Sequence, residues 1–228
     1  MEWATPGTRR GDGVAAVLLD LADVMVVTEC TLGVLPPGHV VAGGDDWGYR
    51  VDDPTRRKVA LWSRWPWRDV DPVGHPDLPP GRFVAGSTDT PIGEVRVVGV
   101  CVPWAGAHVS TGRRDRRQWE DHERYLRALP EVLAGQPRPL VVAGDLNQRL
   151  PRSRQPEQVH QLLVEALNGL EILTTGDTEA GQLIDHIAVS SGLRASDPQL
   201  VPSTDDSGPL SDHTGVTVAL HPVAGQAH

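Results

Sequence analysis

Apolar residues along the chain follow two kinds of pattern. Short continuous runs, such as Val24–Thr28 and Leu140–Ala143, are typical of strands that are buried on both faces. Between these runs, apolar residues return at helical spacing, as Val14 and Leu18 do within Asp12–Ala22. Because runs and helical segments alternate along the chain, the pattern predicts an α/β fold.

The predicted strands cover Val24–Glu29, Val40–Gly43, Val59–Ser63, Arg82–Ser87, Glu94–Val102, Leu140–Ala143, Ile184–Ser190 and Thr214–Leu220, and the predicted helices cover Asp12–Ala22, Arg113–Leu133 and Pro156–Leu167. The stretch Pro66–Gly81 is rich in Pro, Gly and Asp, which predicts a surface loop. Strand patterns continue on both sides of it. We therefore expect one domain over residues 1–221 and a loose tail over residues 222–228.

Composition narrows the class of protein. With 228 residues, 39% hydrophobic and 22% charged, the chain has the make-up of an ordinary globular protein. No apolar run reaches the roughly 18–20 residues of a membrane span, and the N-terminus lacks the features of a signal peptide. The two cysteines, Cys30 and Cys101, do not form a disulfide framework. We expect a cytoplasmic protein without a membrane span.

The net charge of −9 argues against a protein that binds nucleic acid over its whole surface. An enzyme that binds nucleic acid in a local basic groove is still possible at this net charge.

Acidic motifs follow the predicted strands. They are Gly144-Asp145-Leu146-Asn147, Ile184-Asp185-His186 and Ser211-Asp212-His213, with Glu29 at the end of the first predicted strand. Strand ends of one sheet converge on one edge, so we expect these carboxylates to form a negative pocket. No lysine lies near them in the sequence. Mg²⁺ and Mn²⁺ prefer oxygen ligands of this kind.

This ordered set of motifs resembles the endonuclease/exonuclease/phosphatase superfamily, whose members share the DNase I-like fold. The resemblance extends from about Glu2 to Leu220. It implies a two-sheet β-sandwich flanked by helices on both faces. It also implies metal-dependent cleavage of a phosphate ester, whether in DNA, RNA, phosphoinositides, sphingolipids or nucleotides.

The resemblance implies a role for each matching residue. Glu29 matches the metal-binding glutamate, and Asp212 matches an aspartate that binds metal or orients water. Asp145 matches the aspartate that activates the attacking water or protonates the leaving oxygen. Asn147 matches the asparagine that contacts the scissile phosphate and the metal.

The Asp-His pairs complete the expected site. By resemblance, His213 binds a phosphoryl oxygen, and Asp185 orients its ring and raises its pKa. Such a pair would supply positive hydrogen bonding to an anionic phosphodiester. His186 follows Asp185 on an alternating strand, so it faces the other way and is expected to be structural.

The N-terminus departs from the family pattern. The family's first strand usually carries an asparagine that helps to hold the metal, and some bacterial members continue from it into Glu-Trp-Ala. Here Glu2-Trp3-Ala4 follows directly on Met1. We therefore expect the first strand to be missing or truncated, and our hypothesis is a misplaced start codon.

A second departure is Cys101, which stands where many relatives have His or Tyr near the phosphate. Cys101 is expected to be a small buried hydrophobe, and His108 is the candidate substitute from the following loop. Arg149 and Arg152 follow the Gly-Asp-Leu-Asn motif, and guanidinium groups suit phosphate. These arginines and the basic stretch 113–117 could bind substrate phosphate, or they could simply lie on the solvated surface.

The sequence thus favours a nuclease-like phosphodiesterase that uses Mg²⁺ or Mn²⁺ and an activated water. Two alternatives stay open. The chain could act on a phosphorylated lipid or metabolite as a phosphatase or phosphodiesterase, or it could be a degenerate family member that binds a partner without catalysis. The partner expected in the first case is a phosphate ester, including nucleic acid, and no oligomeric state is favoured.

Overall fold

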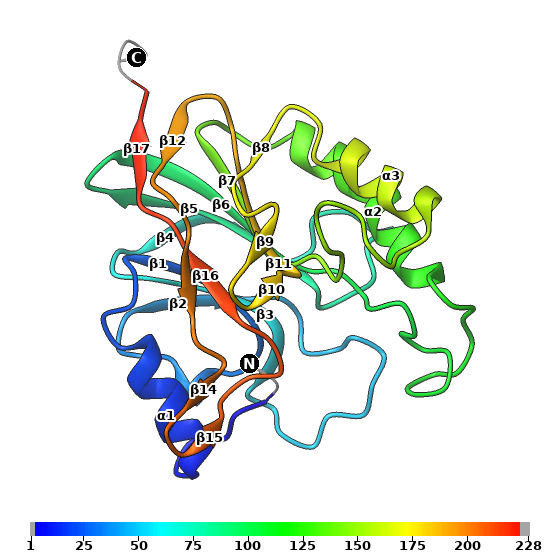
Figure 1. The fold of residues 1–228 in the computed structure, drawn as a ribbon, viewed down its shortest axis with the longest axis horizontal. Helices are drawn as coiled ribbons and strands as arrows, with labels where there is room; N and C mark the ends of the chain where they lie inside the picture. The colour runs from blue at the N-terminus through cyan, green and yellow to red at the C-terminus, as the bar shows by residue number, and fades with distance from the viewer. Residues whose placement is uncertain (1–2, 224–228) are drawn as a thin grey trace.

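The computed structural model describes residues 3–223, which form two sheet layers with helices on their outer faces (Figure 1). The large sheet contains β4 (Trp67–Asp71), β5 (Phe83–Thr90), β6 (Gly93–Cys101), β7 (Leu140–Asp145), β11 (Asp185–Val189) and β8 (Glu171–Ile172), in that spatial order. The small sheet contains β1 (Val24–Thr31), β3 (Arg56–Ser63) and β2 (His39–Ala42), in that order.

Within residues 3–223, the helices are α1 (Arg9–Leu18), α2 (Glu120–Ala134) and α3 (Glu157–Ala166), with the 3-10 turn η1 (Leu32–Val34). The other strands of the described residues form two-stranded ribbons: β12 (Leu193–Ala195) with β17 (Leu220–Pro222), β13 (Gln199–Val201) with β16 (Gly215–Thr217), β9 (Asp177–Thr178) with β10 (Gly181–Gln182), and β14 (Thr204–Asp205) with β15 (Gly208–Pro209).

Three apolar clusters hold these layers together. Helices α2 and α3 cover the outer face of the large sheet, with Tyr125 and Leu163 fully buried against it. A second cluster, including Leu61 and Val97, lies between the two sheets. A third joins α1 to the outer face of the small sheet, where Met25 is buried. The predicted two-sheet sandwich flanked by helices on both faces is confirmed.

The large sheet brings three strand ends together. Strands β6 and β7 are parallel and place Cys101 opposite Asp145, while the antiparallel pair β7–β11 places Asp145 opposite Asp185. The segment between β6 and β7 carries α2 across the outer face of the sheet, as parallel pairing requires.

Three predicted segments in the first two thirds of the chain differ from the structure. The helix predicted over Asp12–Ala22 is observed as α1, Arg9–Leu18. Helix α2 begins at Glu120 rather than at Arg113, because Trp119 has a left-handed backbone (φ 69°) and its N–H donates to the carbonyl of Ala105. The segment Pro66–Gly81, predicted as a loop, contains β4 at the edge of the large sheet. An edge strand tolerates such a composition because only one side of it pairs.

The C-terminal part is also more divided than predicted. The run Thr214–Leu220 becomes β16 and the start of β17, and β17 extends to Pro222, into the predicted tail. Residues 224–228 of that tail lie outside the described residues. The short ribbons were missed because two or three residues are too few to show a period.

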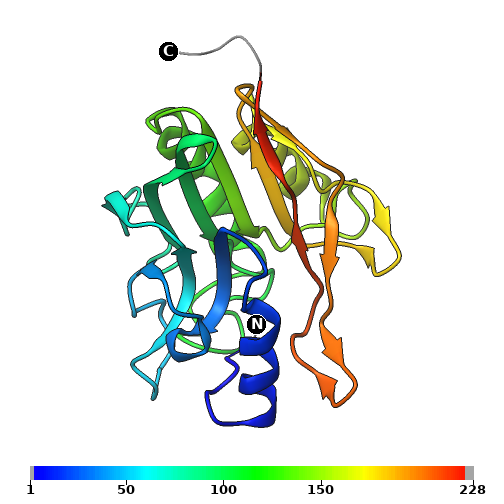
Figure 2. The same ribbon diagram turned by 90° about the vertical axis from the view of Figure 1, so that its left-hand side faces the viewer.

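A groove of about 640 Å³ separates β1 from the β13–β16 ribbon. Figure 2 shows the ribbon beside β1 in the same layer, with the large sheet behind both. Among the described residues, β1 pairs only with β3, and β16 pairs only with β13. The layer opposite the large sheet is therefore interrupted between these two strands.

No helix between residues 3 and 223 combines the length and the apolar character that crossing a bilayer would need.

Candidate active site

The Gly-Asp-Leu-Asn motif forms a tight loop at the end of β7. Gly144 has a φ of 133°, and a Cβ there would lie 2.0 Å from the carbonyl oxygen of Val100, so only glycine fits. Asp145 accepts hydrogen bonds from the backbone N–H of Asn147 at 2.8 Å and from its Nδ2 at 2.9 Å. Asn147 is left-handed (φ 52°), and its Nδ2 also donates to the carbonyl of Val102. The motif therefore fixes the Asp145 carboxylate.

The environment of Asp145 holds a proton on its carboxyl group at higher pH than usual. Its side chain is almost fully buried, at 6% exposure. Burial, followed by the negative charge of Asp185, raises the pKa of Asp145 to about 7, although the positive charge of His213 acts in the opposite direction. A carboxyl group with this pKa is suited to proton transfer near neutral pH.

His213 lies between two carboxylates. Its Nε2 is 2.8 Å from Asp185 Oδ2 and its Nδ1 is 2.9 Å from Asp212 Oδ1. Burial opposes the charged ring, but the hydrogen bonds to Asp185 and Asp212 outweigh it and raise the pKa of His213 to about 10. The same bond to His213 holds the pKa of Asp212 well below its usual range. His213 is therefore an imidazolium that donates to both carboxylates.

The structure brings Asp185 and His213 together, and a third side chain joins them. The sequence predicted the pair Asp185–His213, and the structure adds Asp212 on the other ring nitrogen of His213. Asp185 is the less exposed carboxylate, at 17% of its side chain against 50% for Asp212.

Glu29 is paired with a cation that the sequence order did not reveal. It lies in β1 with a left-handed backbone (φ 49°), and its Oε1 forms an ion pair with Nζ of Lys58 on the neighbouring strand β3. Lys58 is the one lysine of the chain, and Nζ also lies 5.1 Å from the ring centre of Trp3. The antiparallel register of β1 and β3, rather than sequence proximity, brings it there.

The oxygen donors around this site suit a hard cation that is held by few protein ligands. The charge of Glu29 acts on Asp145, and the Lys58 ammonium next to Glu29 shows that its carboxylate takes a cationic partner. Among the described residues, no three His, Cys, Asp or Glu side chains are grouped so that they could hold a metal ion. Mg²⁺ is commonly bound by one or two carboxylates, with waters and substrate phosphate completing its shell. The donor set fits that mode of binding.

A buried polar chain fixes the residue that follows the motif. The Gln148 side chain donates through Nε2 to the carbonyl of Val159 and lies 2.9 Å from His122 Nε2. The Gln148 carbonyl oxygen accepts from His186 Nε2, and the other ring nitrogen of His186 contacts Thr174 Oγ1 at 3.0 Å. His186 is 1% exposed, so its predicted structural role is confirmed.

The sequence did not predict this structural role of Gln148, because a single glutamine after a motif forms no recognisable sequence pattern.

Cys101 faces the same region but has no reactive character. It is 1% exposed, and burial raises the pKa of its thiol to about 12, so the predicted burial is confirmed. The buried side chain of Arg82 contacts it, with Nη1 at 3.2 Å from the Cys101 carbonyl oxygen and 3.8 Å from Sγ.

His108 is part of the loop packing. Its Nε2 lies 3.1 Å from the Trp47 carbonyl oxygen, and its Nδ1 accepts from the N–H of Arg113. Its ring packs against Tyr49, and burial followed by the Arg113 charge lowers its pKa. With both ring nitrogens engaged by backbone groups, the structure gives His108 no free group for substrate.

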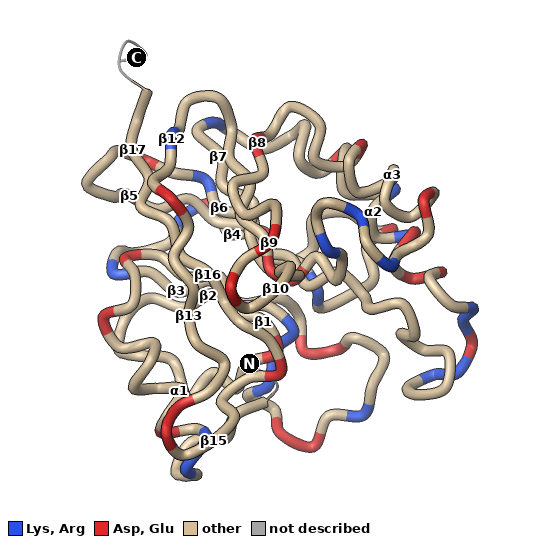
Figure 3. Tube along the Cα trace, in the orientation of Figure 1, with Lys and Arg blue, Asp and Glu red and all other residues tan. Residues whose placement is uncertain are grey.

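Most of the candidate arginines are paired with acids. Arg113 and Arg116 both contact the buried carboxylate of Asp121, and Arg152 contacts Glu157 at 2.7 Å. Arg149 is exposed and directly follows Gln148. Figure 3 shows acidic residues interleaved with basic ones in the loop before α2. Arg149 is therefore the arginine that stays best placed to meet an anionic substrate.

Comparison with known proteins assigns the chain as a whole to a family. The family model described as the endonuclease/exonuclease/phosphatase family matches residues 2–213. Among proteins with curated descriptions, none matches the chain significantly.

Solved structures give the same fold. The 3'-5' exonuclease NExo from Neisseria meningitidis is 22% identical, with a TM-score of 0.64, and the match covers 96% of this chain and 98% of that one. The endonuclease domain of TRAS1, a telomere-specific non-LTR retrotransposon, is 16% identical, with a TM-score of 0.62 and coverages of 96% and 95%. A family protein from Bacteroides vulgatus is 15% identical, with a TM-score of 0.64 and coverages of 94% and 90%. By the family model and this fold, the chain belongs to the endonuclease/exonuclease/phosphatase family.

Proposed function

We propose that the chain is a metal-dependent phosphodiesterase that hydrolyses a phosphate ester with an activated water. The observation that carries this proposal is a cluster of three side chains. Asp145, a buried acid with a pKa of about 7, lies opposite Asp185 in the sheet, and Asp185 contacts the His213 imidazolium at 2.8 Å, so that the charge of His213 acts on Asp145. The family as a whole consists of metal-dependent phosphoesterases. A base and a fixed positive charge at one edge of a sheet suit water attack on an anionic ester.

Each residue has a physical role in the proposed reaction. Ionised Asp145 accepts a proton from the attacking water, and the two hydrogen bonds from Asn147 hold its carboxylate in place. His213 donates through Nδ1 to a phosphoryl oxygen of the substrate. This hydrogen bond replaces the one that Nδ1 makes to the exposed carboxylate of Asp212 in the structure. Nε2 stays on the less exposed Asp185, which fixes the ring.

The cation in this proposal is Mg²⁺ or Mn²⁺, with Glu29 as a ligand and Asp212 as a second candidate. When bound, it would neutralise charge on the phosphate and lower the barrier to attack. Lys58 already balances the charge of Glu29, so a divalent cation has to share or displace that ion pair.

The substrate we favour is a nucleic acid strand or a small phosphodiester. Exposed Arg149 beside the motif supports an anionic ligand that extends beyond the scissile group. The net charge of −9 and the acid-paired arginines near α2 favour a short contact with the substrate over a long basic track.

The first experiment compares the wild type with Asp145→Asn on plasmid DNA, RNA, a generic phosphodiester and a generic phosphomonoester, each with Mg²⁺, Mn²⁺ or EDTA. We expect metal-dependent cleavage of diesters by the wild type and a loss of about 10²-fold or more in the variant, because the proton acceptor is gone. Asp206→Asn, at an exposed site, is the matched control.

Faster cleavage of the monoester would instead identify a phosphatase. A folded wild type that binds metal without turnover on any of these substrates would support a non-catalytic binding protein.

A further inference from the structure

The exposed indole of Trp104 lies beside the candidate site and has no part in the proposed reaction. Trp104 is in the loop that follows β6, and 47% of its surface is exposed. All seven tryptophans of the chain lie within the described residues, and Trp104 is the exposed one among them. Tryptophan is enriched at surfaces that bind a partner, because its ring offers a large apolar area together with a polar N–H.

The loop that carries Trp104 borders the candidate site. The N–H of Val102, two residues earlier, donates to the carbonyl of Asp145 at 2.8 Å, and the Val102 carbonyl accepts from Asn147 Nδ2. Two residues of chain span at most about 7 Å. In the sheet, β6 and β11 lie on opposite sides of β7, so this loop flanks the strand of Asp145 on the side away from Asp185.

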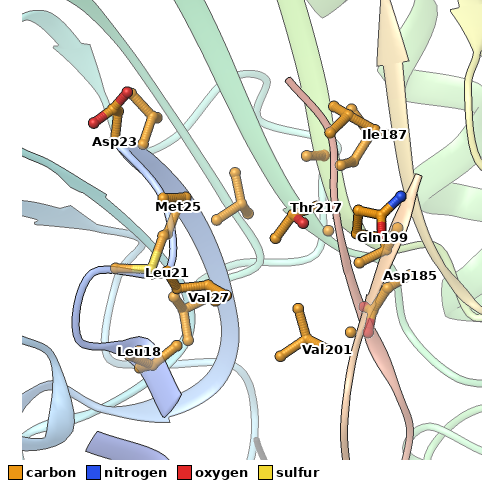
Figure 4. A pocket seen from close by; sticks show the side chains of 18 of the residues that line it. Leu18, Leu21, Asp23, Met25, Val27, Asp185, Ile187, Gln199, Val201 and Thr217 are labelled. Carbon is orange, nitrogen blue, oxygen red and sulfur yellow. The ribbon is translucent and has the colours of Figure 1, made fainter. Parts of the chain in front are cut away.

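The other side of the site borders the apolar groove. Figure 4 shows Asp185 on one wall of this groove, across from Met25 and Val27 of β1. The groove is lined mainly by aliphatic side chains, and the described residues that line it include no Trp, Tyr or Phe. An aromatic group of the substrate would therefore find its stacking partner on the β6 side of the site.

The backbone around Trp104 is held in place by hydrogen bonds. Four successive carbonyl oxygens in the loop accept one each. They belong to Val102, Pro103, Trp104 and Ala105, and their donors are Asn147 Nδ2, His122 Nδ1 and the N–H groups of Ala107 and Trp119. A side chain on a loop fixed in this way loses little further freedom when a ligand binds, which favours affinity.

The ring itself rests against Gly106. A Cβ at residue 106 would lie 2.4 Å from both Cη2 and Cζ3 of Trp104, so a glycine is needed for the ring to take this position. Backbone thus covers part of the indole, while about half of the residue stays open to solvent. A fixed and partly open aromatic face is suited to stacking on a flat ring of a ligand.

The neighbouring charges favour a nucleotide over a lipid as that ligand. Exposed Arg149 directly follows the catalytic motif, and Arg114 is exposed farther along the Trp104 loop. Cationic groups beside an aromatic ring match the two parts of a nucleotide, the phosphate and the base. Insertion into a membrane uses a larger apolar face. Among the described residues of this loop, only Val109 accompanies Trp104 as a large exposed hydrophobic side chain.

We propose that Trp104 is the stacking platform for a nucleobase next to the scissile phosphate. Because a base inside a duplex has both faces covered by its neighbours, the platform selects unpaired bases, as in single strands and strand ends. This inference rests on the proposed function for the position of the phosphate, and it narrows the substrate class from phosphodiesters in general to those that carry a base.

The test compares a fluorescent thymidine oligonucleotide with an abasic oligonucleotide of the same length and charge. Both are titrated with the Asp145→Asn chain in Mg²⁺, which prevents cleavage, with and without Trp104→Ala. We expect Trp104→Ala to raise the Kd of the thymidine strand about 5- to 100-fold, which corresponds to the loss of one stacked base, and to leave the Kd of the abasic strand unchanged. Leu19→Ala, which removes a side chain of similar exposure (59%) after α1, is the control and should change neither Kd.

Two further variants separate stacking from a structural role of Trp104. Trp104→Phe keeps an aromatic face and should retain most of the affinity for the thymidine strand. Gly106→Ala should weaken binding of the thymidine strand alone, because its Cβ displaces the indole, whereas its φ lies outside the left-handed region and adds no backbone strain. Thermal unfolding shows that each variant is folded.

Three results would overturn the inference. They are an equal loss of affinity for both strands in Trp104→Ala, an unchanged affinity for the thymidine strand in that variant, and binding of neither strand by the parent chain. If Trp104→Ala instead abolished binding to phosphatidylcholine vesicles and left strand binding unchanged, the ring would be assigned to a lipid surface.

The proposed function is tested separately by turnover of a generic phosphodiester by the wild type. Cleavage without any preference for a base would reject the stacking platform and leave the proposed function standing. Base-selective binding without cleavage of any substrate would do the reverse.

Discussion

At the scale of single residues, the site depends on opposite effects of burial and charge on neighbouring groups. Burial and the charge of Asp185 raise the pKa of Asp145 to about 7. For His213, hydrogen bonds to Asp185 and Asp212 outweigh burial and raise the pKa to about 10. Between these two values, Asp145 is ionised while His213 is still protonated, which is the combination that the proposed reaction needs.

This predicts a bell-shaped dependence of kcat/KM on pH. Activity should rise as the pH passes about 7, because Asp145 loses its proton, and fall as the pH passes about 10, because His213 loses its own. In Asp185→Asn, the loss of a negative charge should lower both pKa values and move both limbs to lower pH. Limbs that stay in place in this variant would contradict the assignment.

Glu29 gives a second prediction at this scale. Glu29→Gln should raise the Mg²⁺ concentration for half-maximal activity by about tenfold or more, because a metal ligand loses its charge. A titration of activity against Mg²⁺ measures the change, with Glu179→Gln at an exposed position as the control. The same half-maximal concentration in both variants would remove Glu29 from the metal site.

At the scale of elements, strand ends and tight loops place the chemistry. The register of β6, β7 and β11 puts Cys101, Asp145 and Asp185 side by side. The loop after β7 is then held by Gln148, which links to His122 on α2 and to His186 on β11. Helix α2, which contributes no group to the candidate site, thereby helps to fix the loop that carries Asp145.

The glycine of the motif makes this dependence testable. Gly144→Ala should destabilise the chain by about 3 kcal/mol or more, because its Cβ would meet the Val100 carbonyl oxygen at 2.0 Å in a left-handed backbone. Gly169→Ala is the matched control, since its φ is also positive (82°) but no atom lies within 4 Å of its Cβ. The control should cost about 1 kcal/mol. Urea unfolding measures both, and equal losses would refute the steric explanation.

At the scale of the whole molecule, charge limits how the chain meets a substrate. The net charge is −9, and the arginines before α2 are paired with Asp121 and its acidic neighbours. The molecule therefore offers a local contact for an anion rather than an extended basic surface.

We therefore expect a shallow dependence of DNA cleavage on salt. Two phosphate contacts correspond to a loss of about tenfold in affinity between 50 and 200 mM salt, whereas six or more would cost about 10³-fold or more. Measuring KM for DNA over this range tests the prediction. Arg149→Ala should raise KM and flatten the dependence further, while a steep slope would indicate a longer basic track.

The sequence by itself determined the α/β class and the order of the acidic motifs, because buried strands need apolar runs and the site residues follow directly where those runs end. It also predicted that His186 turns away from Asp185, since side chains alternate along a strand. The start of α2, by contrast, depends on the bond between Trp119 and Ala105. The strand β4 depends on its pairing with β5.

Only the tertiary structure decided which charges meet. Lys58 reaches Glu29 through strand register. Asp212 and Asp185 meet on opposite nitrogens of His213, although 26 residues lie between them in the sequence. The groove between β1 and β16 is likewise a property of packing, because it is formed by segments from both ends of the chain. Local patterns fix which residues are buried or exposed, whereas pairing across the sequence sets the distances on which electrostatics and binding depend.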